Sequence, residues 1–314
     1  MARQIVALAG GVGGAKLGLG LAQILPPESL TLVINTGDDE SFHGLHVSPD
    51  LDTVMYTLAH LANPETGWGI AGDTFNALAR LGQYGGPTWF NLGDSDLATH
   101  IQRTLWLRNG QTLSQVTQNL CQALGIRHAI VPMSDEYVRT IAVTEEGEMS
   151  FQVYFVQNKT KPRLQSIRLD GLVQAHMAPA FREAFDWADT IVFCPSNPII
   201  SIGPILALQG VRAAIADFKG QRIAVSPIVG GKALRGPTAK MLHELGESVS
   251  VVGIARRYQE LCDILVIDNI DQSLATEIEA MGIAVAVTNI VMNTPEERTR
   301  LAETILDLSK PHAH

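Results

Sequence analysis

The sequence predicts an α/β protein with a Rossmann-like, doubly wound and mostly parallel sheet. Short apolar segments recur along the 314 residues and alternate with segments of helical periodicity. Continuous apolar strands are typical of a parallel sheet whose two faces are both covered by helices. The predicted strands are Gln4–Ala9, Leu30–Asn35, Pro87–Asn91, His128–Val131, Thr190–Cys194, Arg222–Val225, Ile264–Ile267 and Ala284–Val287.

Amphipathic segments between most of these strands predict the covering helices. They are Leu51–Leu61, Asp96–Leu107, Leu113–Leu124, Thr238–Leu245 and Glu296–Leu308. Residues 136–172 break the alternation, because Glu136–Gln157 shows two alternating strands around the turn Glu-Glu-Gly-Glu. We therefore expect a small β-rich insertion or cap at 136–172. No low-complexity linker divides the chain, so residues 1–314 are expected to form a single domain.

The composition argues against several classes of protein. The net charge of −9 comes from 32 acidic and 23 basic side chains, and such a surface is poorly suited to binding nucleic acid. No apolar segment approaches the ~20 residues that span a bilayer, so no membrane contact is expected. The cysteines Cys121, Cys194 and Cys262 are far apart and form no CxxC pattern. We therefore expect neither structural zinc nor disulfides, and a cytoplasmic location.

A glycine-rich segment, LAGGVGGAKL, follows the first strand and opens a helix. A strand, a glycine-rich turn and a helix place backbone N–H groups where they can bind phosphate. Lys16 stands where the dinucleotide fingerprint needs its third glycine, and the P-loop pattern also fails. The alternative is a tight turn without a ligand. We favour a phosphate site formed by Gly10, Gly11, Gly13 and Gly14.

Carboxylates gather after the second strand, in the loop and helix that follow it. Oxygen ligands of this kind suit Mg²⁺, which proteins bind through one or two carboxylates together with substrate phosphates. N-capping alone would explain an aspartate such as Asp50 at the start of a helix. Four carboxylates in one otherwise sparsely charged segment favour a metal site. The predicted Mg²⁺ ligands are Asp38, Asp39, Asp50 and Asp52.

Further polar side chains follow other predicted strands or open helices, and we expect them at the same rim of the sheet. Asp73 and Asp94 could be helix caps alone, but Asp94 and Asp96 are also candidates for binding substrate. In the second half, small hydroxyls and two cations surround strand-to-helix turns, as a diphosphate requires. Solvent-exposed loops are the alternative for the cations. The candidates there are Ser196, Asn197, Ser201, Ser226, Lys232 and Arg235.

Taken in order, these segments resemble the 2-phospho-L-lactate transferase family of coenzyme F-420 biosynthesis. The motifs span nearly the whole chain: AGGVGGAKL, NTGDD, SPDLDTVMYTL, GWGIAGDTFN, GDSDLATHIQRT, MSDEYVRT, YFVQ, PSNPIISIGPIL and SPIVGGKALRGPTAKM. The resemblance implies a Rossmann-like fold and a Mg²⁺-dependent transferase. Such an enzyme moves a phospholactyl or phosphoenolpyruvyl group from a guanosine-diphospho donor to the deazaflavin Fo and releases GMP.

The resemblance also implies a homodimer and gives Asp50 a role, since it matches the family aspartate that contacts Fo. Asp50 is therefore the candidate catalytic residue. Ser95 departs from the family pattern, in which a basic residue often separates the two aspartates of GDxD. The alternative function is a non-catalytic regulator of the same superfamily that binds nucleotide sugars. SPDLDTVMYTL and GWGIAGDTFN favour the transferase, whose three-carbon acid stays open between lactate, enolpyruvate and similar groups.

Overall fold

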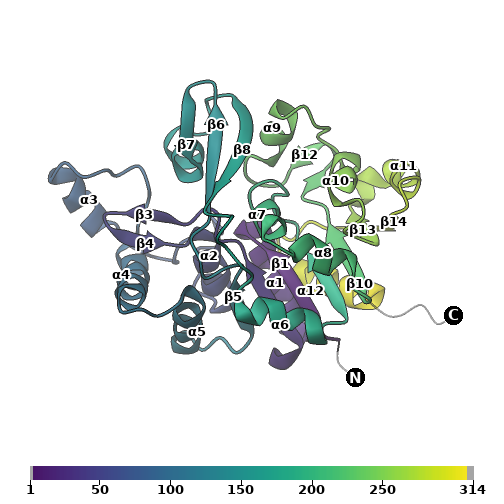
Figure 1. Cartoon of the computed structure of the whole chain (residues 1–314), viewed down its shortest axis with the longest axis horizontal. Coiled ribbons are helices and arrows are strands. Elements are labelled where there is room, and N and C mark those ends of the chain that lie inside the picture. The colour runs from purple at the N-terminus through teal and green to yellow at the C-terminus, as the bar shows by residue number, and fades with distance from the viewer. Residues whose placement is uncertain (1–2, 310–314) are drawn as a thin grey trace.

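The computed structural model of the chain describes residues 3–309 and contains a seven-stranded parallel sheet (Figure 1). The α/β, Rossmann-like fold class predicted from the sequence is confirmed. In spatial order the strands are β14 (Ala284–Val287), β13 (Ile264–Ile267), β10 (Gln221–Val225), β9 (Thr190–Phe193), β1 (Ile5–Ala9), β2 (Leu30–Ile34) and β5 (Ala129–Pro132).

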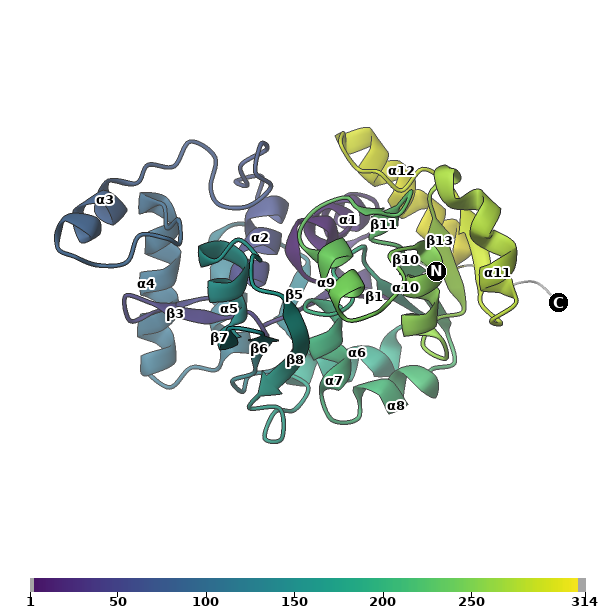
Figure 2. The same cartoon turned by 90° about the horizontal axis from the view of Figure 1, so that it is seen from above.

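Both faces of the sheet are buried, which explains why its strands are continuously apolar. Every residue of β1 is buried: Val6 and Leu8 face one core, and Ile5 faces the other. Figure 2 shows the sheet between α1 and α12 on one side and α6 and α8 on the other. The first layer comprises α1 (Gly11–Ile24), α2 (Pro49–Leu58), α5 (Leu113–Ala123) and α12 (Pro295–Leu308). The second comprises α6 (Pro179–Trp187), α7 (Ile202–Ala207), α8 (Val211–Ala216), α9 (Thr238–Glu244) and α10 (Val251–Tyr258).

One predicted strand, Pro87–Asn91, is wrong. This segment is a loop between α3 (Asn76–Gln83) and α4 (Asp94–Arg108). Its apolar side chains pack instead on the hairpin of β3 (Glu40–Phe42) and β4 (Leu45–Val47), where Phe90 stacks on Phe42 at 4.2 Å between ring centroids. A short apolar run reports burial but does not say which partner buries it, so the pattern alone could not exclude this placement.

The insertion contains the expected hairpin, followed by a segment that the sequence analysis misassigned. Strands β6 (Arg139–Thr144) and β7 (Gly147–Ser150) pair antiparallel, and β8 (Leu164–Asp170) pairs with the other edge of β6. The second strand ends at Ser150, because residues 151–157 are helical and include the π-turn η2 (Val153–Gln157). Phe151 stacks on Phe155 at this helical spacing.

Shorter elements complete the fold. They are η1 (Pro27–Ser29), β11 (Ile228–Val229), β12 (Lys232–Ala233), η3 (Asn269–Leu274) and α11 (Ala275–Glu279). Within residues 3–309, none of the helices has the length and apolar character needed to cross a membrane.

The strand order creates a topological switch point between β1 and β9. From β1 the chain moves outward to β2 and β5, then returns to β9 on the other side of β1 and moves outward again to β14. Consequently, the loops that leave β1 and β9 run to opposite faces of the sheet. A crevice opens between such loops at the carboxyl ends of the strands, and ligands of doubly wound folds bind there.

Candidate active site

A cavity of ≈ 740 Å³ opens at this switch point. Its wall is formed by loops at the carboxyl end of the sheet, by α2 and by the helical segment of the insertion. It includes many of the residues predicted to bind substrate: Gly10, Gly11, Gly13, Asp38, Asp50, Asp96, Ser196, Asn197, Ser201 and Arg235. Four others lie outside the lining: Gly14, Asp94, Ser226 and Lys232.

The opening glycines allow the start of α1 to approach the loop after β9 closely. A Cβ on Gly10 would lie 2.4 Å from Asp50 Oδ2, and a Cβ on Gly13 would lie 2.3 Å from the Pro195 carbonyl oxygen. Real side chains cannot approach that closely, so both positions require glycine. The first turn of α1 still lines the cavity. The glycines thus serve packing, and they also leave the amino end of a fourteen-residue helix at the cavity wall, where an anion is favoured.

Ser196, Asn197 and Ser201 shape the opposite lip of the crevice. Ser196 Oγ accepts a hydrogen bond from the Gly10 N–H at 3.1 Å and donates one to the Gly10 carbonyl at 2.8 Å. Asn197 Oδ1 accepts hydrogen bonds from the backbone of Ile199 and Ile200, which closes the turn before α7. These contacts join the β1 and β9 loops at the switch point.

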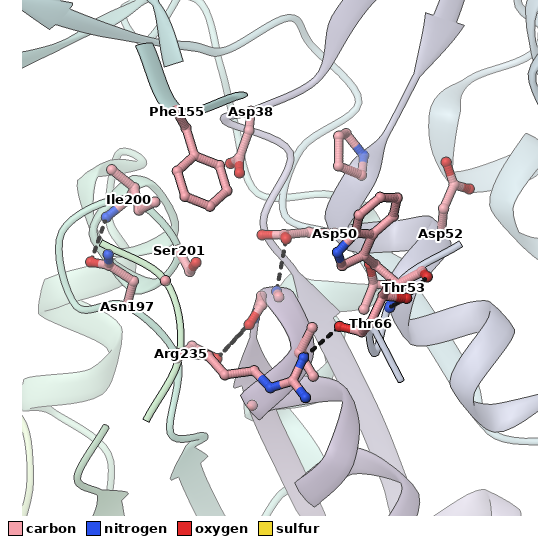
Figure 3. A pocket seen from close by; sticks show the side chains of 18 of the residues that line it. Asp38, Asp50, Asp52, Thr53, Thr66, Phe155, Asn197, Ile200, Ser201 and Arg235 are labelled. Carbon is pink, nitrogen blue, oxygen red and sulfur yellow. Dashed lines mark hydrogen bonds between the residues drawn. The ribbon is translucent and has the colours of Figure 1, made fainter. Parts of the chain in front are cut away.

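Asp38 and Asp50 form what we call the carboxylate pair. The side-chain amide of Asn35 donates hydrogen bonds to Asp38 Oδ1 and to Asp50 Oδ2, the second at 2.9 Å. Asp50 Oδ1 accepts the N–H of Gly11, the first residue of α1, at 2.7 Å. Figure 3 shows both carboxylates directed toward the open centre of the cavity. Asp50 is therefore not the N-cap of α2, a position that Ser48 occupies.

The carboxylate pair carries negative charge without a matching cation among its hydrogen-bond partners in residues 3–309. Burial, with the charge of Asp50 second, holds the pKa of Asp38 well above its usual range. Burial, with a smaller effect of the Asp39 charge, raises the pKa of Asp50 to about 6. Two close, buried carboxylates that repel each other at the edge of a cavity fit a divalent cation, which would remove the repulsion.

The other two predicted metal ligands do not converge with this pair. Asp39 Oδ2 accepts hydrogen bonds from Ser48 Oγ at 2.8 Å and His46 Nε2 at 2.9 Å. Asp52 forms a two-pronged ion pair with the fully buried guanidinium of Arg103. In Figure 3 the Asp52 carboxylate points away from the Asp38–Asp50 centre. Of the four predicted ligands, only Asp38 and Asp50 converge, because sequence proximity did not show which way each side chain turns.

A second group, which we call the arginine network, consists of Asp52, Asp96, His100 and Arg103. Arg103 Nη1 lies 3.2 Å from His100 Nδ1, and His100 Nε2 lies 3.1 Å from Asp96 Oδ2. The atoms of Asp52, Asp96 and His100 are close enough to hold a metal ion. However, Arg103 already neutralises Asp52 and also faces the histidine, whereas neither carboxylate of the carboxylate pair has a cationic partner.

Asp94 caps a neighbouring helix, as the alternative interpretation of its sequence suggested. Its carboxylate accepts hydrogen bonds from the N–H groups of Asn76 and Ala77 at the start of α3. Asp73, which precedes α3, caps α4 in the same way: its carboxylate accepts hydrogen bonds from the N–H groups of Ser95 and Asp96. These reciprocal caps join α3 to α4, and Asp94 is withdrawn as a substrate ligand.

The two predicted cations differ in their positions. Arg235 lines the cavity and donates a hydrogen bond to the carbonyl of Thr66, another cavity residue (Figure 3). Lys232 is exposed on β12 outside the cavity, and Ser226 is fully buried, where its hydroxyl closes the turn to Ile228. Lys232 and Ser226 are therefore placed outside the cavity lining, unlike Arg235, which follows the β11–β12 hairpin.

Sequence analysis missed Lys16 as a cavity residue. It lies one turn into α1, lines the cavity and donates a hydrogen bond from Nζ to the Met292 carbonyl at 2.7 Å. Burial, and then the charges of Arg235 and Arg298, lower the pKa of Lys16. Lys16 had been noted only as a mismatch to nucleotide motifs. Its position two residues after the last of the four glycines was the available signal.

The aromatic wall of the cavity was also missed. Trp68, Phe90 and Phe155 come from three separate segments and all line the cavity. Trp68 keeps 46% of its surface exposed, which is unusual for a tryptophan without a ligand or partner. No spacing in the sequence relates these rings, because only the fold brings their loops together.

Comparison with known proteins decides the family. The model of the family described as 2-phospho-L-lactate transferase CofD matches residues 5–301. This chain belongs to the CofD family. A phosphoenolpyruvate transferase of Streptomyces griseus is 42% identical over 98% of both chains. A 2-phospho-L-lactate transferase of Methanosarcina mazei is 37% identical over 96% of this chain and 99% of its own. The resemblance predicted from the motifs is confirmed, and the chain is a CofD-family transferase.

A solved structure supports the fold. Protein BH3568 of Bacillus halodurans has a TM-score of 0.63 to this chain, with 14% sequence identity, and the match covers 98% of this chain and 100% of that one. At that identity the likeness concerns the fold alone. It agrees with the Rossmann-like architecture described above.

Proposed function

We propose that this transferase moves a phospholactyl or phosphoenolpyruvyl group from a guanosine-diphospho donor to the deazaflavin Fo, with release of GMP, in coenzyme F-420 biosynthesis. The observation that carries the proposal is a single cavity whose lining holds two chemically different sets of groups. The start of α1, Lys16 and Arg235 offer N–H groups and cations, which suit a diphosphate. The aromatic wall with Trp68 and Phe90 suits a flat ring. The carboxylate pair also lines this cavity.

In the proposed reaction, the primary hydroxyl of the Fo side chain attacks the phosphorus that bears the three-carbon acid. A new P–O bond forms, the P–O bond to GMP breaks, and the hydroxyl proton leaves. Asp50 is held by Asn35 and Gly11 at the edge of the cavity and is placed to position the hydroxyl and accept its proton.

The charge of the diphosphate must be neutralised for this step, and an acidic protein cannot do that with its overall field. Lys16 and Arg235 would hold the donor oxygens from the α1 side. Asp38 and Asp50 would hold Mg²⁺, which supplies charge neutralisation to the diphosphate when it is bound. Because both cations and the carboxylate pair line one cavity, positioning accounts for most of the proposed catalysis.

The direct test is a set of reactions containing the protein, Fo, Mg²⁺ and one donor at a time, with either lactate or enolpyruvate as the acid. Mass spectrometry should show Fo extended by one phospho-acyl group and an equal amount of GMP. Chelator-treated protein should be inactive until Mg²⁺ or Mn²⁺ is restored. Absence of product with every donor would refute the proposed reaction, whereas full activity in chelator would refute only the metal.

We also propose that the chain works as a homodimer. The support is the family resemblance together with Ile101 and Leu105, which are 54% and 50% exposed on neighbouring turns of α4. Light scattering should give twice the mass of one chain. A mass of one chain across a wide range of concentrations would contradict the proposal.

A further inference from the structure

We propose that the carboxylate of Asp96 accepts a hydrogen bond from a donor on the ring of the acceptor and so selects the flavin-like ring. This inference rests on the proposed function, because it places the ring of Fo against the aromatic wall. The donor is an N–H or O–H group carried by the ring itself. In Fo these are the imide N–H and the phenolic hydroxyl at opposite ends of the ring.

The Asp96 carboxylate is held in place on the cavity wall. Oδ1 accepts a hydrogen bond from Tyr56 Oη at 2.6 Å, and Oδ2 lies 3.1 Å from His100 Nε2. Burial alone would raise the pKa of Asp96, but the contacts from His100 and Tyr56 outweigh burial and lower it. A carboxylate that stays ionised in a half-desolvated wall is a strong acceptor with lone pairs to spare.

The arginine network explains why this orientation is fixed. Guanidinium groups only donate hydrogen bonds, so His100 Nδ1, 3.2 Å from Arg103 Nη1, must accept. The histidine proton is then on Nε2, next to Asp96, although the angle there is poor for a hydrogen bond. Asp52 in turn fixes Arg103. The network thus fixes His100 Nε2 beside Asp96, while Tyr56 Oη donates the hydrogen bond that holds the carboxylate.

Helix capping does not explain why an aspartate is needed here. Asp96 occupies the first turn of α4, where a carboxylate often satisfies backbone N–H groups. That task is performed by Asp73, whose side chain accepts the N–H groups of Ser95 and Asp96 itself. The Asp96 side chain instead turns to Tyr56 and lines the cavity.

Asp50 and Asp96 lie at different places along the cavity, which leaves room for an acceptor with a ring and a hydroxyl chain. Asp50 and Tyr56 both belong to α2, and six residues of helix rise by about 9 Å. Asp96 lies beyond Tyr56, at the hydroxyl of that side chain. An acceptor whose chain end reaches Asp50 would therefore extend its ring toward Asp96, and Trp68 and Phe90 line the same cavity.

The experiment measures binding of Fo and of two analogues, one methylated on the imide nitrogen and one on the phenolic oxygen, by their fluorescence. The proteins are the wild type and Asp96→Asn. A hydrogen bond to a charged group contributes about 1.5–3 kcal/mol, so Asp96→Asn should weaken Fo binding about 10- to 100-fold. One analogue should bind the wild type about 10- to 100-fold more weakly than Fo does. The same analogue should bind Asp96→Asn as tightly as Fo binds that variant. That analogue identifies the ring donor.

Asp135→Asn is the matched control. It removes the same charge from a carboxylate that accepts a helix-terminal N–H, that of Ser114, outside the cavity. It should bind Fo as the wild type does. Guanosine diphosphate binding by Asp96→Asn, together with its thermal unfolding, shows whether the fold persists. If the variant is unfolded, the test passes to Tyr56→Phe, which should weaken Fo binding through the loss of the Oη contact.

Two results would overturn the inference. One is unchanged Fo binding by a folded Asp96→Asn. The other is a result in which, for both analogues, methylation weakens binding by the same factor in the wild type and in Asp96→Asn. Methylation and substitution would then act independently, which means that neither methylated group contacts Asp96. Turnover of Fo by the wild type tests the proposed reaction separately. Absence of turnover would contradict the reaction, whereas unchanged binding by Asp96→Asn would contradict only the ring contact.

Discussion

The carboxylate pair and the arginine network lie on the wall of one cavity, and both are buried, but their electrostatics differ. Asp50 has a pKa raised to about 6, while the pKa of Asp96 is lowered. Burial opposes ionisation in both places, so the difference comes from the partners. Asp96 contacts His100 and lies near Arg103, whereas Asp38 and Asp50 share only the neutral amide of Asn35 and repel each other.

This comparison shows that ligand geometry alone does not locate a metal. The arginine network has a ligand geometry that could hold an ion, yet Arg103 already pairs with one of its two carboxylates, that of Asp52. The carboxylate pair also has two acidic groups, but neither of them has a cationic partner. We infer that the cation belongs with the pair and that the network orients a carboxylate for a neutral hydrogen-bond donor.

The largest effect should come from Asp50→Asn, which removes the charge of the pair nearest to α1. Turnover should fall by about 10²–10⁴-fold, the usual range when a positioned acid or base is lost. Product formation measured by mass, with circular dichroism to confirm folding, checks this. Turnover within a few-fold of the wild type would show that Asp50 is neither the base nor a ligand of the cation.

Arg103→Met should instead act on stability, because it leaves Asp52 buried without its partner. Removing one member of a buried pair costs about 3–5 kcal/mol. Urea unfolding measures this loss in the free energy of unfolding. The double variant Arg103→Met/Asp52→Asn should recover part of it, since it leaves no unpaired charge. If both variants are equally stable, or the single variant matches the wild type, the network does not balance charge as described.

Arg235→Ala should weaken use of the donor and spare Fo. A charge-assisted hydrogen bond to phosphate contributes about 1.5–3 kcal/mol, so the KM for donor should rise about 10- to 100-fold. Lys232→Ala, an exposed cation three residues away outside the cavity, should change neither constant. Steady-state kinetics in which the donor and Fo are varied in turn measure the KM for each substrate in both variants. Equal effects of both variants would mean that Arg235 does not contact the donor.

The smallest predicted effect concerns the pH dependence of stability in the metal-free protein. The pKa of Asp50 is about 6 in the folded chain and near 3.8 when unfolded, so the folded state binds more protons between these values. Its contribution to stability therefore falls as the pH rises from about 4 to about 6, by on the order of 2–3 kcal/mol.

Asp50→Asn removes this dependence. The stability of the variant relative to the wild type should therefore increase over the same pH interval, as measured by urea unfolding at several pH values. A constant difference would show that Asp50 titrates normally.

The fold was largely predictable because β-strands buried on both faces leave a continuous apolar pattern. Ile5–Ala9, Thr190–Phe193 and Ile264–Ile267 were placed within two residues for this reason. Pro87–Asn91 shows the limit, because its apolar residues are buried by the β3–β4 hairpin, which the sequence pattern did not indicate. The helix at 151–157 shows a second limit of the sequence pattern. Over a short segment, a strand and a helix can both produce the same pattern of apolar residues.

The sequence predicted which loops form the site, but it did not predict which of their side chains face the cavity. Residues after β1, β2 and β9 were expected at one crevice because parallel strands end at the same edge. Which of the aspartates face the cavity depends on partners far away in the sequence, such as Arg103 for Asp52. Asp94 lies two residues from Asp96, yet it caps α3 while Asp96 lines the cavity.

The most direct test of the division between the two groups is the position of a bound cation. A crystal soaked with Mn²⁺ and guanosine diphosphate should show an anomalous difference peak in contact with Asp38 and Asp50. No peak should appear among Asp52, Asp96 and His100, where Arg103 already supplies the positive charge. A peak in the arginine network, with none at the carboxylate pair, would contradict the account.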